Sequence, residues 1–318
     1  MIRWAPGLFS GSLVIVAASA PGSLMLLGEH AVLHGRISAV MAIQRRIRVR
    51  LALRPDRDVR IDSSLGFHQT TLDDVAPHPS FRFLLAAVCC FKAWLPRGVD
   101  IKVESDFSHT VGFASSAATT VAAVAALRSL SGLSAKPNEI LADAVEIIRA
   151  VQGRASGADA AAAVFGGVVA YRAEPLEVRK LHATLRGLAV YCGYKTPTPQ
   201  VIQFVENHWK DRRRELDLLY DRIGANADEG IAALERGDLA AFGRALDQGQ
   251  LLMDQLGVNT PELQAIVERL RSDPGILGAK ISGSGLGDCA IGIGAPTLPW
   301  RDYAVFPVET DRSGVRIE

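Results

Sequence analysis

Small residues at Gly112–Ala118 run directly into the start of an expected helix, a pattern that can bind an anion. Exposed backbone N–H groups and the positive end of the helix dipole attract phosphates at such a point. Small side chains let a phosphate approach the backbone, and a serine hydroxyl can ligate Mg²⁺. The segment lacks Gly-Lys-Ser/Thr and is therefore not a Walker A loop; an ordinary helix capped by serine is the alternative.

Three other segments carry residues that could take part in chemistry. Asp159 ends a loop of small residues at 153–159, where it could act as a general base or cap the following segment. The polar turn Gly28–His30 lies between apolar runs and could contact a substrate or cap a helix. Alternating glycines in Gly283–Gly287 permit a tight turn with close backbone approach, or form a hairpin loop without function.

The elements that must position these segments follow from apolar periodicity and from Gly and Pro punctuation. Strands are expected over 11–20, 37–53, 99–105, 187–193, 279–282, 289–293 and 303–308, with a hairpin at 58–75 and a strand at the end of 160–172. Helices are expected over 80–95, 116–130, 137–152 and 199–223, with two or three more in 225–272. Arginines 46, 48 and 50 coat one side of the second strand, and a solvated face is favoured there over a phosphate site. The class is α+β in two parts.

Composition excludes several functions. The chain has 35 Lys plus Arg against 34 Asp plus Glu, a net charge of +1, so it lacks the basic surplus of a general nucleic-acid binder. No run reaches the roughly 18 apolar residues of a membrane span. Residues 8–20 mimic a secretory leader, but the four cysteines show no ligand or disulfide pattern, which favours reduced thiols and a cytoplasmic protein.

The order and spacing of the four segments, from about residue 17 to 294, resemble the GHMP kinases, which include galactokinase, homoserine kinase, mevalonate kinase and phosphomevalonate kinase. Within that family, Ala20–Val32 looks most like the mevalonate kinases. The resemblance implies an N-terminal mixed α/β domain, residues 1–185, that binds nucleotide phosphates. It also implies a C-terminal domain, residues 186–318, that is helix-rich, has a ferredoxin-like sheet and completes the acceptor site.

The same resemblance implies an ATP-dependent kinase that uses Mg²⁺ and phosphorylates mevalonate in isoprenoid precursor synthesis. Asp159 would be the catalytic carboxylate, with Ser23 beside the reacting groups. The nucleotide would bind at Gly112, Ala114, Ser115, Ser116 and Ala117, and Mg²⁺ at Ser116 and Glu146. The acceptor, mevalonate or a related alcohol, would bind at Glu29, His30, Thr196, Gly283, Ser284 and Gly285. No nucleic-acid or membrane partner is expected, and a homodimer is plausible for such a protein.

Two departures from the family pattern concern charge. Mevalonate kinases carry a lysine where this chain has Ser23, and the first lysine of the chain is Lys92. A serine hydroxyl cannot supply the electrostatic stabilisation of an ammonium group; Lys195 and Arg154 are candidates for it by sequence neighbourhood. The family also carries a glutamate where this chain has Ile148. A kinase acting on phosphomevalonate or another small alcohol, a decarboxylase relative and an inactive nucleotide-binding relative are therefore alternatives.

Overall fold

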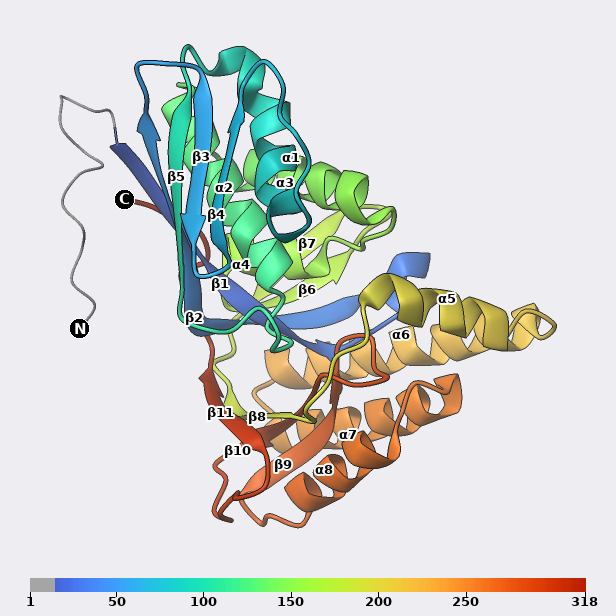
Figure 1. The fold of residues 1–318 in the computed structure, drawn as a ribbon. Helices are drawn as coiled ribbons and strands as arrows, with labels where there is room; N and C mark the ends of the chain where they lie inside the picture. The colour runs from blue at the N-terminus through green and yellow to red at the C-terminus, as the bar shows by residue number, and fades with distance from the viewer. Residues whose placement is uncertain (1–14) are drawn as a thin grey trace.

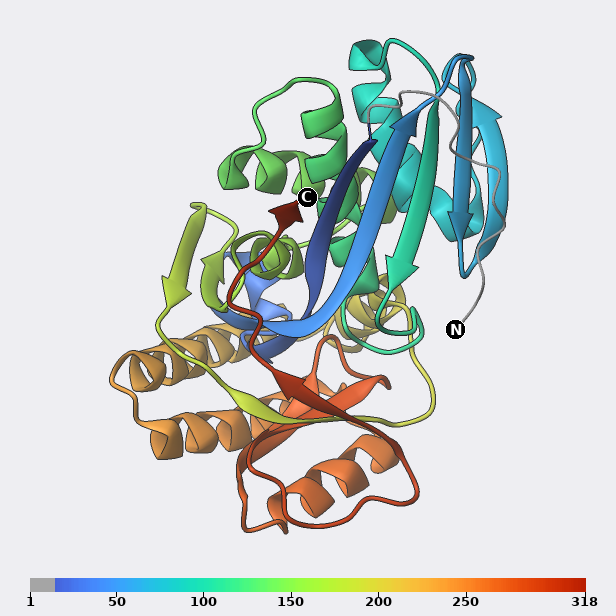
Figure 2. The same cartoon turned by 90° about the vertical axis from the view of Figure 1, so that its left-hand side faces the viewer.

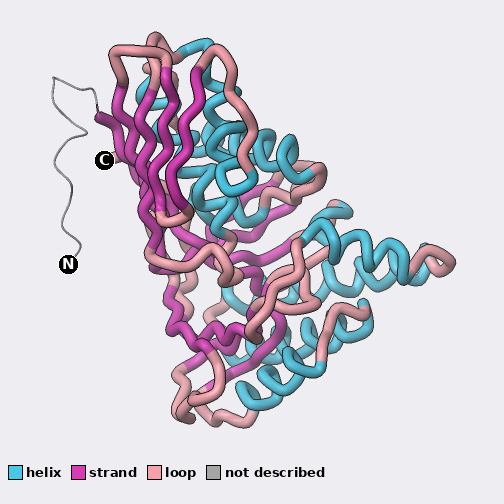
Figure 3. Tube along the Cα trace, in the orientation of Figure 1, coloured by secondary structure: helices cyan, strands magenta, loops and turns pink. Residues whose placement is uncertain are grey.

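The computed structural model describes residues 15–318 and confirms the α+β class. Two β-sheets lie one below the other, and the helices pack on the same side of both (Figures 1 and 3). One cluster of buried side chains joins the two sheets, and it includes Leu27, Phe113, Ala189, Phe242 and Ile291. None of the helices in residues 15–318 is long and apolar enough to cross a membrane. The four cysteines form no disulfide.

The first sheet has eight strands. They are β1 (Ile15–Leu27), β2 (Ser38–Leu53), β3 (Asp58–Ser63), β4 (Gly66–Thr71), β5 (Val99–Ser105), β6 (Val168–Arg172), β7 (Glu177–Leu181) and β12 (Arg316–Ile317). The main order is β12-β1-β2-β5-β3-β4, and β6 pairs with both β2 and β7. Four helices pack with this sheet: α1 (Arg82–Phe91), α2 (Ser115–Leu130), α3 (Pro137–Gln152) and α4 (Ala158–Phe165). The middle of α2 is buried on all sides, because it contacts β1, β2, α1 and α3.

The second sheet has four antiparallel strands, β8 (Arg186–Tyr191), β9 (Ile276–Ser282), β10 (Cys289–Gly294) and β11 (Ala304–Glu309). Their order, β11-β8-β10-β9, is the ferredoxin-like order that the resemblance implies. The helices α5 (Thr198–His208), α6 (Arg213–Glu235), α7 (Leu239–Leu256) and α8 (Pro261–Arg271) all lie between β8 and β9 in the chain. The proposed domain limit at 185/186 falls between β7 and β8, and it stays a prediction.

Several expected boundaries are wrong. β1 does not stop at Pro21-Gly22 but continues to Leu27, because a register irregularity between Pro21 and Ser23 absorbs the proline. The strand expected at the end of 160–172 is present as β6, but it begins at Val168, after Gly166-Gly167, and the alanine run before it belongs to α4. The helix expected over 199–223 is two helices with a break at 209–212. Part of the expected strand and leader-like segment, residues 8–14, lies outside the described residues.

Two arginines of β2, Arg46 and Arg48, bind the end of the chain. After β11 the chain returns to the first sheet, where β12 pairs with β1 (Figure 2). Arg46 lies 2.5 Å from the Asp311 carboxylate and donates to the Gly314 carbonyl at 2.6 Å, and Arg48 pairs with Glu318 at 3.1 Å. Residues beyond 309 therefore pack on the first sheet, although the predicted limits place them in the C-terminal domain.

Candidate active site

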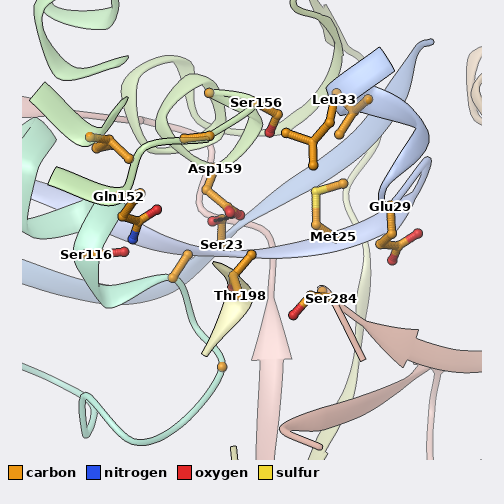
Figure 4. Close-up of a pocket in the computed structure, with 18 of the residues that line it drawn as sticks. Ser23, Met25, Glu29, Leu33, Ser116, Gln152, Ser156, Asp159, Thr198 and Ser284 are labelled. Carbon is orange, nitrogen blue, oxygen red and sulfur yellow. Dashed lines mark hydrogen bonds between the residues drawn. The ribbon is translucent and has the colours of Figure 1, made fainter. Parts of the chain in front are cut away.

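A pocket collects most of the predicted site residues from both sheets (Figure 4). The predicted residues that line it are Ser23, Glu29, His30, Gly112, Ala114, Ser116, Ala117, Asp159, Gly283 and Ser284. They come from β1, the turn after it, the loop before α2, the start of α4 and the loop after β9. Segments that are far apart in the chain thus form one cavity.

Ser23 and Asp159 meet inside this pocket. The Ser23 hydroxyl donates to the Asp159 carboxylate oxygen Oδ1 at 2.7 Å, and Figure 4 shows the two side chains pointing toward each other. Asp159 is the second residue of α4, and the N-cap is Gly157, so Asp159 does not cap this helix. Burial raises the pKa of Asp159, while the hydrogen bond from Ser23 and the charge of Lys195 act in the opposite direction. The arrangement suits a general base.

The predicted phosphate loop leaves the start of α2 open. The N-cap is Ala114, in the left-handed region with φ of 51°, and among the described residues no side chain caps this end of the helix. An ordinary serine-capped helix is therefore excluded, and the first-turn N–H groups are free for an anion. The loop is held against β1, because the Ser23 N–H donates to the Phe113 carbonyl at 3.1 Å. A Cβ on Gly22 would lie 2.7 Å from that carbonyl oxygen, so the contact requires glycine.

The turn Gly28–His30 connects the two sheets as well as lining the pocket. The buried Glu29 carboxylate pairs with the ammonium group of Lys280 on β9, which also donates to a backbone carbonyl. His30 Nε2 donates to the Ser284 carbonyl at 2.9 Å. Burial lowers the pKa of His30, which leaves the ring neutral and its Nδ1 an acceptor. Burial also lowers the pKa of Lys280, against the effect of Glu29.

A second ion pair lines the pocket. Lys195 Nζ is 3.0 Å from Asp288 Oδ2, and both residues line the pocket. The chain after β8 is bound along the glycine loop, because the Asp288 N–H donates to the Tyr194 carbonyl at 2.8 Å and the Thr196 hydroxyl donates to the Leu286 carbonyl at 2.5 Å. These contacts fix Lys195 beside Asp288.

Four predicted residues do not line the pocket: Ser115, Glu146, Thr196 and Gly285. Glu146 is an exposed residue of α3, and its charge acts on Cys90 of α1. It is therefore not placed to bind a metal ion in this pocket. Thr196 holds the glycine loop, and Gly285 takes a φ of 83° against Val258. Ile148 does line the pocket but offers no ligand oxygen.

Sequence reasoning missed Asp288 and Lys280 as site residues. Asp288 directly follows the segment Gly283–Gly287, and a carboxylate next to these glycines was an available signal. Lys280 is a charged residue within an apolar strand, which is a weaker signal. In residues 15–318 no group of three or more His, Cys, Asp or Glu side chains could hold a metal ion. A metal ion here would therefore need ligands from a bound substrate as well.

Known proteins match most of this chain. The family models described as GHMP kinases N terminal domain and GHMP kinases C terminal match residues 82–167 and 231–297. The mevalonate kinase of Archaeoglobus fulgidus is 33% identical over 304 residues, which cover 95% of this chain and 99% of that protein. The mevalonate kinase of Aeropyrum pernix is 31% identical over 284 residues, 87% of each chain.

This chain belongs to the GHMP kinase family. Solved structures agree on the fold of this GHMP kinase. The L. major mevalonate kinase in complex with R-mevalonate has a TM-score of 0.76 at 23% identity, over 96% of this chain and 97% of that one. The Lactococcus lactis galactokinase complexed with galactose has a TM-score of 0.78 at 17% identity, over 95% of each chain.

Proposed function

We propose that this GHMP kinase transfers the γ-phosphoryl group of ATP to a hydroxyl of mevalonate. The observation that carries the proposal is the Ser23–Asp159 hydrogen bond in the pocket that also contains the open end of α2. A proton acceptor and a phosphate-binding helix end in one cavity are what transfer to an alcohol requires. The archaeal relatives named mevalonate kinase, at 25–33% identity over most of the chain, support mevalonate as the acceptor.

Asp159 is the group that takes the proton. The acceptor hydroxyl oxygen bonds to the γ-phosphorus, the bond from that phosphorus to the β–γ bridging oxygen breaks, and ADP leaves. The hydroxyl proton passes to the Asp159 carboxylate. Ser23 donates to Oδ1 and keeps that carboxylate oriented and ionised, because a hydrogen bond to the charged form opposes the effect of burial on its pKa.

Lys195 supplies the positive charge that Ser23 cannot. Two cationic residues line the pocket, Lys195 and Arg154. Arg154 is 62% exposed and pairs with Glu206 on α5, whereas Lys195 acts electrostatically on Asp159. An ammonium group that faces the transferred phosphoryl group stabilises the charge of the transition state. The lysine after β8 thus takes over the electrostatic role expected at position 23.

ATP would bind with its phosphates at the first turn of α2, where Gly112, Ala114 and Ala117 leave room for them. Mg²⁺, which neutralises phosphate charge in such reactions, fits this site because the Ser116 hydroxyl lines the pocket beside that turn. Glu29 and His30, held by β9 and the glycine loop, would shape the acceptor end. The cytoplasmic location and the homodimer suggested by the sequence stay predictions.

Phosphomevalonate is the second candidate acceptor. Arg154 lines the pocket, and a guanidinium group suits recognition of an additional phosphate. The Arg154–Glu206 ion pair, which would have to open, argues against this acceptor.

An ADP-release assay across several acceptors tests the proposal. The purified protein is supplied with ATP and Mg²⁺, and (R)-mevalonate, phosphomevalonate, galactose and homoserine are added in turn. We expect turnover with (R)-mevalonate that exceeds turnover with every other acceptor. Turnover with phosphomevalonate alone would establish the second candidate, and ATP binding without turnover on any acceptor would contradict both.

A further inference from the structure

Tyr171 of β6 places a hydroxyl group among apolar side chains. Its side chain is 1% exposed and packs in the cluster of buried residues around α2 and α4. Strand pairing fixes its backbone, because Tyr171 lies opposite Ser38 of β2 and Val178 of β7. Burial raises the pKa of Tyr171, so the hydroxyl stays protonated at neutral pH and needs an acceptor. Phenylalanine would fill the same space without this requirement.

The acceptor lies in the loop that leads into Asp159. The Tyr171 hydroxyl donates to the Ser156 carbonyl at 2.6 Å. The next residue, Gly157, lies so close that a Cβ there would be 2.6 Å from the Tyr171 oxygen, and its φ of 91° also favours glycine. Both contacts fix the backbone of the loop against the tyrosine.

Ser156 transmits this restraint to the start of α4. Its hydroxyl accepts from the Ala158 N–H at 3.2 Å, and Asp159 is the next residue of the helix. Asp159 in turn accepts from Ser23 at 2.7 Å, and Ser156, Asp159 and Ser23 all line the pocket (Figure 4). A shift of the loop would therefore move the Asp159 carboxylate within the pocket.

We infer that Tyr171 is a positioning residue of this kinase, whose hydrogen bond to the Ser156 carbonyl holds the Asp159 carboxylate where it accepts the substrate proton. Tyr171 acts through the backbone, because its own side chain does not line the pocket. A displacement of about 1 Å at a reacting group can lower a rate by about 10²-fold, so one such bond matters for turnover. The inference rests on the proposed function for the role of Asp159.

Kinetics of Tyr171→Phe give the first test. This variant removes the hydroxyl and keeps the ring, so the core should stay filled and the protein folded. We expect kcat to fall by about ten-fold and KM for ATP to stay within about two-fold of the wild type, because the start of α2 belongs to another loop. Tyr303→Phe, which removes a hydroxyl outside the pocket, is the matched control and should behave as the wild type does. An unchanged kcat in Tyr171→Phe would overturn the inference.

The pKa of Asp159 separates positioning from a loss of stability alone. It is measured without turnover by NMR spectroscopy of protein labelled at the aspartate carboxyl carbons, with Asp159→Asn to assign the signal. Tyr171→Phe should raise this pKa, because a displaced carboxylate loses the hydrogen bond from Ser23 that favours its ionised form. In Ser23→Ala that bond is already absent, so adding Tyr171→Phe should change the pKa and kcat much less.

Two results would leave Tyr171 with a role in stability alone and would overturn the inference. One is an Asp159 pKa in Tyr171→Phe that equals the wild-type value. The other is an equal loss of kcat when Tyr171→Phe is made in the wild type and in Ser23→Ala. Lys195 and Glu29, whose charges also act on Asp159, are unchanged in all these variants. If the pKa shift is found but the wild-type protein does not phosphorylate mevalonate, only the proposed acceptor is overturned.

Discussion

Two ion pairs lie close to the pocket, and they differ in what surrounds them. Glu29–Lys280 is closed off, with side chains 3% and 0% exposed, and Lys280 also donates to a backbone carbonyl. Lys195–Asp288 is more open, with side chains 34% and 17% exposed, and both residues line the pocket. A buried pair with its groups satisfied holds structure, whereas an open pair that lines a pocket can contact a ligand.

The positions of the two pairs explain the difference. Glu29–Lys280 joins the turn after β1 to β9, deep between the sheets, where it fixes how the two sheets meet. Lys195–Asp288 joins the segment after β8 to the glycine loop, and both residues line the pocket. Lys280 and Lys195, both in the second half of the chain, thus have different roles. The residue type alone does not distinguish these roles.

The largest effect is expected at Asp159, on which the charge of Lys195 in the open pair acts. Asp159→Asn should lower kcat by about 10²–10⁴-fold, the usual contribution of a general base. ATP affinity should stay within a few-fold of the wild type, because Asp159 binds no phosphate in this account. Steady-state kinetics with mevalonate and nucleotide titration measure the two quantities. Retention of kcat would show that Asp159 is a structural residue. It would also remove the reason to assign Lys195 a role beside it.

A substitution pair sharpens the assignment of charge to Lys195. Lys195→Met should lower kcat by about 10²–10³-fold, comparable with the loss of one group that stabilises a transition state. Adding Ser23→Lys to that variant should recover activity at least about ten-fold, whereas Ser23→Lys alone should lower activity because Ser23 orients Asp159. Lys210→Met, at an exposed residue outside the pocket, is the matched control. No recovery in the double variant would argue that Lys195 acts only through Asp288.

A smaller effect is expected on the pH dependence of kcat/KM. Burial holds the pKa of Asp159 above its ordinary value, so kcat/KM should fall on the acid side as this carboxylate becomes protonated. Ser23→Ala removes a hydrogen bond that favours the ionised form, and the acid limb should therefore move to higher pH. The plateau rate should fall only about ten-fold, the effect of one such bond. Ser80→Ala, at an exposed position near α1, should leave the profile unchanged; a shift to lower pH in Ser23→Ala would contradict the account.

Features that depend on residues adjacent in the chain could be predicted from the sequence. The segment Gly112–Ala118 could be predicted as a phosphate loop because small residues run directly into a helix, and β5 was placed at 99–105 as observed. Asp159 was a candidate from its loop, although its assignment between base and cap needed the structure. The contact with Ser23, across 136 residues, was what decided it.

The sequence could not predict which residues far apart in the chain contact each other. Lys280 meets Glu29 across 251 residues, and no periodicity connects a charged residue in β9 with a turn after β1. Glu146 was chosen only because it is the carboxylate nearest to Ile148 in sequence, and helix geometry turns two such neighbours to different faces. The contact of Asp288 with Gly112 was hidden for a similar reason, since the two residues lie in loops that are far apart in the chain.

The most direct test of the contrast between the two pairs measures stability and turnover in Lys280→Met and Lys195→Met side by side. Lys280→Met leaves the Glu29 charge buried without its partner, and the free energy of unfolding should fall by about 3–5 kcal/mol. Lys195→Met should change that free energy by less than about 1 kcal/mol, because the pair is partly exposed, while kcat falls as stated above. Denaturant unfolding and kinetics with mevalonate below the melting temperature give both numbers. We expect the loss of stability in Lys280→Met and the loss of kcat in Lys195→Met to separate in this way; equal effects of the two variants on stability, with kcat preserved in Lys195→Met, would contradict this contrast.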